Sequence, residues 1–124
     1  MNKSLTKAEE QVMQILWKLG QGFLKDILES SPDPKPHSNT IATILKILVE
    51  KGFVKYQVQG RNNLYMPKVS KEEYGRKSMN QLVKRYFENS PAKLVSQFLS
   101  DEKLSVEELE ALLQQIKSAK TSNK

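Results

Sequence analysis

The feature that most limits how this chain can fold is a short β-prone stretch between two helical stretches. Two runs rich in β-branched and aromatic residues, Phe53–Val58 and Asn63–Met66, are separated by the turn-forming residues 59–62. This pattern predicts a single β-hairpin. The fold class is therefore expected to be mainly α with a small β-hairpin.

The first two predicted helices precede a stiff connector. A capping box formed by Thr6 and Glu9 begins the first helix, and Gly20 ends it. The second helix covers residues 23–30 and stops at residues 31–36, because the three prolines there disfavour helical geometry. Trp17 lies off the apolar stripe of the first helix and is expected to pack against another element. The stripe itself is predicted to be buried and contains Ala8, Val12, Ile15, Leu16 and Leu19.

A third helix is predicted to follow the connector directly. Ser38 or Asn39 would serve as its N-cap, and Gly52 would end it after Lys51 as a left-handed C-cap. Three helices followed by a hairpin are typical of a winged helix-turn-helix. We therefore predict a winged-helix DNA-binding domain over residues 1–68.

The remaining residues, 69–124, are predicted to form a helical dimerisation domain with a short polar tail. Capping boxes at residues 70–73 and 105–108, with Pro91 between them, indicate three helices. Helices this short and this apolar do not readily bury their own faces, so pairing with a second copy is expected. The predicted dimer interface consists of Leu82, Val83, Tyr86, Phe87, Leu94, Val95, Phe98, Leu109, Leu113 and Ile116.

Composition narrows the function. The 124 residues include 20 Lys and Arg against 14 Asp and Glu, a net charge of +6 that favours a polyanionic partner. With no cysteine and His37 as its one histidine, the chain has no convincing metal site or catalytic set, so we expect neither a cofactor nor an enzyme. No apolar run approaches the ~20 residues that span a bilayer, and no signal peptide is evident, so we expect a cytoplasmic protein without membrane insertion.

The third helix and the hairpin carry the candidate DNA contacts. Small hydrogen-bonding residues and a lysine share one face of the helix, a pattern that suits base edges in a major groove. The hairpin turn presents cations and amides where a wing would meet the DNA backbone or minor groove. An ordinary solvated surface is the alternative in each case. The candidates are Ser38, Asn39, Thr40, Ala42, Thr43 and Lys46 on the helix, and Lys55, Arg61, Asn62 and Asn63 on the wing.

Several short segments together resemble a known family, the BlaI/MecI group of penicillinase repressors. They are residues 5–9, 12–17, 40–43 and 48–54, and the likeness covers residues 5–116. The resemblance implies a homodimeric repressor bound to double-stranded DNA at a palindromic operator. The resemblance also implies that resistance-type members have an arginine at the position of Ala42. The operator of this chain therefore need not match theirs. Copper-responsive members carry a cysteine-rich tail that this chain lacks.

The resemblance also implies a mode of induction. In the β-lactam-responsive members, a membrane sensor-protease triggers cutting within the dimerisation region. The matching stretch here is residues 94–99, and the implied cleavage site is Gln97-Phe98, with Gln97 in place of the family's asparagine.

Two other classes of function compete with a repressor. A winged helix can act as a protein-protein adaptor without sequence-specific DNA binding, because fold does not settle function. Such an adaptor would not bind duplex DNA with an affinity that falls steeply as the salt concentration rises. A small RNA-binding module would instead prefer single strands or A-form duplex.

Overall fold

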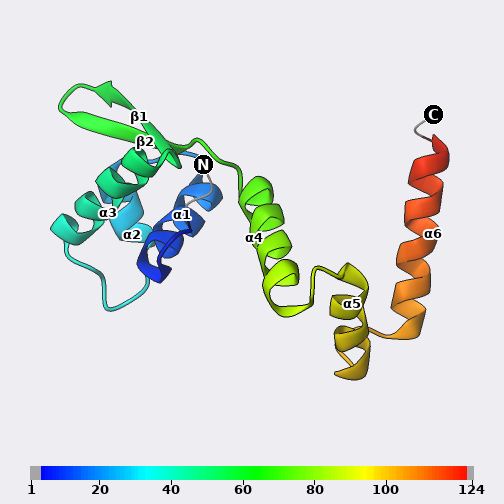
Figure 1. Cartoon of the computed structure of the whole chain (residues 1–124). Helices are drawn as coiled ribbons and strands as arrows, with labels where there is room; N and C mark the ends of the chain where they lie inside the picture. The colour runs from blue at the N-terminus through cyan, green and yellow to red at the C-terminus, as the bar shows by residue number, and fades with distance from the viewer. Residues whose placement is uncertain (1–3, 123–124) are drawn as a thin grey trace. The chain divides into compact units, whose positions relative to one another are not determined.

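A computed structural model of the protein describes residues 4–122, which form six helices and one two-stranded antiparallel hairpin (Figure 1). The chain divides into two compact units, one ending at Arg76 and the other beginning at Lys77. In chain order the elements are α1 (Lys7–Leu19), α2 (Leu24–Ser30), α3 (Ser38–Lys51), β1 (Val54–Gln59), β2 (Asn62–Pro67), α4 (Lys71–Tyr86), α5 (Pro91–Ser100) and α6 (Val106–Ser122).

The predicted capping box begins α1, but the buried stripe of this helix is narrower than predicted. The Thr6 hydroxyl accepts from the Glu9 amide at 3.2 Å, and the Glu9 carboxylate accepts from the Thr6 amide at 3.0 Å. Ala8 and Leu19 are exposed, contrary to the prediction, whereas Met13 is fully buried. The packed face of α1 is centred on residues 12, 13 and 16, so apolar residues at the edge of the stripe remain in solvent.

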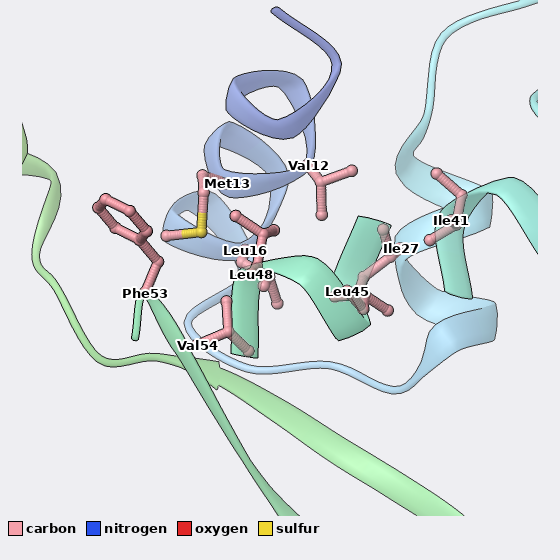
Figure 2. Packing of buried hydrophobic residues seen from close by; sticks show 9 residues of the cluster. All are labelled: Val12, Met13, Leu16, Ile27, Ile41, Leu45, Leu48, Phe53 and Val54. Atoms are coloured by element: carbon pink, nitrogen blue, oxygen red, sulfur yellow. The ribbon is translucent and has the colours of Figure 1, made fainter. Parts of the chain in front are cut away.

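The core of the first unit lies where α1, α2 and α3 converge on the start of β1, and Figure 2 shows nine of its side chains. Burying a large aliphatic side chain contributes roughly 1.5–3 kcal/mol, so this cluster dominates the stability of the unit. The fully buried members are Met13, Leu16, Ile27, Leu45 and Leu48.

The N-cap of helix α3 comes before both of the residues predicted for it. His37 is the N-cap, and its Nδ1 accepts from the Asn39 amide at 3.2 Å, so Ser38 already lies inside the helix. The imidazole ring takes the capping role that the hydroxyl or amide side chain was expected to fill. Gly52 ends the helix with φ +86°, which confirms the predicted left-handed C-cap.

The predicted hairpin is present, with a tighter turn than expected. Gln59 pairs directly with Asn62, so the connection is the two-residue turn Gly60-Arg61 and not residues 59–62. Gly60 has φ +65°, which suits the first central position of a type II′ turn. On the outer edge of β2, Tyr65 exchanges two backbone hydrogen bonds with Gly22, at 2.8 and 2.9 Å. These bonds tie the hairpin to the connection between α1 and α2.

The first turn of α4 belongs to the first unit and packs against the rest of it. The Tyr74 hydroxyl accepts from the Leu5 amide at 3.3 Å, and the Tyr74 ring lies 5.7 Å from Phe53 and 5.9 Å from Trp17 between centroids. The Trp17 indole donates to the Val69 carbonyl at 2.8 Å. Trp17 therefore packs against another element, as predicted.

The second unit contains the rest of α4 together with α5 and α6. Ser90 caps α5, with Pro91 in its first turn, and Ser105 and Glu108 form a complete capping box before α6. Among the side chains that the structure describes in this unit, Val83 alone is buried. These helices are thus well defined locally but have almost no core of their own.

Candidate nucleic-acid interface

Helix α3 presents two chemically different faces. Ile41, Leu45 and Leu48 are at most 3% exposed and anchor the helix in the core. The opposite face is in solvent, because residues three and four apart share one side of a helix. The exposed side chains are those of Asn39, Ala42, Thr43, Lys46 and Glu50.

The N-terminal end of α3 gathers most of the predicted contacts. Ser38 and Thr40 are exposed there beside Asn39, and the Thr43 hydroxyl donates to the Asn39 carbonyl at 2.9 Å. That bond leaves the oxygen lone pairs of Thr43 available as acceptors. His37, which the sequence reasoning did not include, is exposed in the same group. Its position directly before a polar helix face was the signal by which the sequence could have indicated it.

The four hairpin residues predicted to contact DNA lie at different positions on the hairpin. Directly opposite residues share a face of a sheet, so Lys55 lies with Met66 on the side that also carries Asn62. Asn63 lies on the other side, where its amide donates to the Tyr65 hydroxyl at 3.5 Å. Arg61 projects from the turn itself. The structure therefore groups Arg61 and Asn62 near the tip and leaves Lys55 near the base.

An ion pair between the half-buried Lys51 and the buried Glu9 holds the far end of α3. Lys51 donates to Glu9 Oε1 at 2.7 Å, and the Glu9 side chain is 7% exposed. Burial raises the pKa of Glu9, but the hydrogen bonds from Lys51 and Thr6 outweigh burial and hold that pKa below its ordinary value. Lys51 also donates to the Ser4 carbonyl at 3.2 Å. The last turn of α3 is thus fixed to the start of α1.

The residues predicted to form a dimer interface differ widely in exposure. Val83 is buried, and Phe87, Leu94, Val95 and Leu109 are half-buried. The other five are exposed by more than two fifths: Leu82 43%, Tyr86 70%, Phe98 47%, Leu113 46% and Ile116 51%.

The implied cleavage site lies within a helix. Gln97 and Phe98 belong to α5, and the Gln97 carbonyl accepts from the Asp101 amide at 2.9 Å. The Gln97 side chain donates to the Asp101 carboxylate at 3.2 Å. The Gln97-Phe98 bond is therefore held in helical geometry.

No helix within residues 4–122 combines the length and the apolar character needed to cross a membrane.

Residues 5–118 match the family described as penicillinase repressor. The chain is 26% identical over 121 residues to the penicillinase repressor of Bacillus licheniformis, covering 97% of this chain and 94% of that protein. It is 27% identical over 109 residues to the methicillin resistance regulatory protein MecI of Staphylococcus aureus, covering 87% and 89% of the two chains.

A solved structure supports the fold of the first unit. The DNA binding domain of the repressor BlaI aligns with a TM-score of 0.52 at 28% identity, covering 60% of this chain and 94% of that domain. The likeness confirms the winged helix-turn-helix fold predicted from the sequence.

Proposed function

Because this chain belongs to the penicillinase repressor family of DNA-binding transcriptional repressors, we propose that it acts in the cytoplasm as a homodimer on a palindromic operator. The observation that carries this proposal is the division of α3 into a buried apolar face and an exposed polar face. A helix anchored in this way can place its polar side chains against base edges in a major groove.

Within α3, the N-terminal half makes the proposed base contacts. Asn39 and Thr43 offer amide and hydroxyl groups, and Lys46 follows on the same face within reach of a guanine or a phosphate. Ser38, Thr40 and Ala42 lie in or beside the groove. Glu50 shares this face near the other end of the helix, and its charge opposes phosphate contact, so that end leaves the groove.

The hairpin acts as the wing. Arg61 and Asn62 are exposed near its tip, the part best placed to contact the DNA backbone or a neighbouring minor groove. Lys55 at the base and Asn63 on the opposite side make secondary contacts with phosphates.

Dimerisation is proposed to occur through the second unit. Its exposed apolar side chains, including Tyr86 and Ile116, are an unfavourable surface for a monomer in water. A second copy would cover them and would join two winged helices whose half-sites lie one or more helical turns apart, ~34 Å per turn. Two joined half-site readers also gain effective concentration on the operator.

Induction is proposed to follow cutting at Gln97-Phe98 by a membrane sensor-protease. Because the bond lies inside α5, which has no buried residue, the helix must open before a protease can bind an extended segment. If the host's response is to a β-lactam, treated cells should contain a fragment ending at Gln97, identified by its mass. This route would be excluded if the treated cells contained only the full-length chain while transcription was induced.

The test of repression is binding to the promoter duplex upstream of the protein's own coding region, at several salt concentrations. We expect a sequence-preferring complex of two chains per site. Lys46→Ala should weaken binding and reduce the slope of log affinity against log salt by about one. Lys103→Ala removes the same charge from an exposed position in the second unit and should leave the slope unchanged. Equal affinity for operator and random duplex would favour the adaptor.

A further inference from the structure

An open groove of about 880 Å³ lies on the first unit, on the side of α1 that faces away from α3. Gln14, Trp17 and Lys18 of α1 form one wall, and Lys68, Ser70 and Lys71 at the end of β2 and the start of α4 form the other. On α1, Gln14 and Lys18 lie opposite the face formed by residues 12, 13 and 16 that enters the core. DNA held by the exposed face of α3 would therefore be on the far side of α1.

The charge of this groove is positive. Three lysines line it against one carboxylate, that of Glu72. Within residues 4–122, the ammonium groups of Lys18, Lys68 and Lys71 form no ion pair or side-chain hydrogen bond. Such groups favour a bound anion, because they can donate charge-assisted hydrogen bonds without first losing a protein partner.

One wall of the groove is rigid and aromatic. The Trp17 indole is fixed by its 2.8 Å bond to the Val69 carbonyl and by the Tyr74 ring 5.9 Å away. The half-buried Ile15 also lines the groove. An apolar or ring-shaped body could pack here, while Gln14 and Ser70 add polar groups. The volume lies within the range of about 300–1,000 Å³ that is usual for small-molecule sites.

From this combination we infer that the groove binds a small organic anion, a carboxylate with an apolar or aromatic body. The carboxylate would lie among Lys18, Lys68 and Lys71, and the body would lie against Trp17. Because the walls come from α1 and from residues 67–72, a bound anion would bridge them and hold the start of α4 against α1. This site is separate from the proposed DNA contacts.

The test uses the full chain and 2-naphthoate as the probe. The chain has one tryptophan, so a single indole N–H resonance reports on the groove. We expect a saturable shift of that resonance on titration with 2-naphthoate. The uncharged isostere 2-naphthamide should bind at least about tenfold more weakly, since it lacks the charge-assisted bonds.

Two triple variants locate the site. Lys18→Gln/Lys68→Gln/Lys71→Gln should weaken naphthoate binding at least about tenfold. Lys7→Gln/Lys25→Gln/Lys103→Gln removes the same charge from exposed positions outside the groove and should keep the affinity. All six lysines are exposed, so both variants should fold, which their amide spectra would verify.

Three results would overturn the inference: no saturable shift, equal affinity for naphthoate and naphthamide, or equal loss in both triple variants. None of these results bears on operator binding, which rests on α3.

Discussion

The two units of this protein solve the problem of burying apolar side chains in different ways. The first unit brings three helices and the start of a hairpin around one closed cluster. The second has two capped helices, α5 and α6, and the rest of α4, but one buried side chain among those described. Capping and propensity are thus enough to set where a helix begins, whereas a core requires elements that close over one another. The first unit therefore has a core of its own, whereas the second would gain one from the proposed dimer.

The sharpest test of this contrast truncates one leucine in each unit. Leu45→Ala removes a fully buried side chain and should lower the free energy of unfolding by about 2–5 kcal/mol. Leu112→Ala, at a position 46% exposed, should cost less than about 1 kcal/mol. Chemical denaturation of both variants measures this. Similar costs would mean that Leu112 is buried in the assembled protein and that the contrast describes only the isolated chain.

A second test charges the exposed face of α6. Leu113→Asp/Ile116→Asp should prevent dimerisation, because carboxylates would have to be buried between the copies. Sedimentation should then show a monomer, and operator affinity should fall by about a hundredfold or more. Gln114→Asp/Gln115→Asp adds the same charge to exposed polar positions of the same helix and should remain dimeric. A dimer in the first variant would place the interface elsewhere.

A third test concerns the ion pair that fixes the end of α3. Glu9→Gln should cost about 1.5–3 kcal/mol, because Lys51 loses its carboxylate partner in a largely buried setting. The pKa of Glu9 is lower in the folded than in the unfolded chain, so its contribution is present above the unfolded pKa. This contribution is lost as the pH falls through the folded pKa. The variant should therefore lose less stability than the wild type between neutral and acid pH, and parallel pH profiles would refute this role for Glu9.

The smallest expected effects come from two glycine substitutions, one at the end of a helix and one inside a helix. Gly52→Ala should destabilise the protein by about 1–2 kcal/mol, because the C-cap requires φ +86°. The cost would come from the backbone conformation, since no atom lies within 4 Å of the added carbon. Gly75→Ala lies inside α4 with open space around the added carbon and should stabilise the helix by about 0.5–1 kcal/mol. Thermal melting of both variants would show opposite shifts. Shifts of the same sign would contradict the backbone explanation.

Local signals in the sequence were the reliable ones. The capping box at Thr6 and Glu9, the C-cap at Gly52 and the hairpin all follow from residues within a few positions of one another, and the structure contains each. The N-cap of α3 was misassigned because histidine is not among the usual capping residues. The turn was predicted too long because residues 59–62 all favour turns, whereas strand pairing extends to Gln59 and Asn62.

Long-range contacts were beyond what a linear pattern can indicate. Tyr74 reaches the amide of Leu5 across 69 positions, and Lys51 reaches Glu9 across 42. The burial of Met13 in place of Ala8 likewise depends on how α3 and Phe53 lie against α1. For the interface, the polar face of α3 could be predicted from helical periodicity, but the separation of Lys55 from Arg61 and Asn62 depends on the hairpin register. Their contacts with DNA stay predictions.

The junction between α3 and β1 is short. Gly52 is followed at once by the buried Phe53 and Val54, and the hairpin is tied again at Tyr65 to Gly22. The helix and the hairpin are therefore joined by a short buried connection, and a second backbone contact ties the hairpin to the same unit. If both elements contact the operator as proposed, shifting the wing's site by one base pair, ~3.4 Å along the axis, would keep one set of contacts and lose the other. Binding of that kind would depend on the spacing between the two contacted sites as well as on their bases.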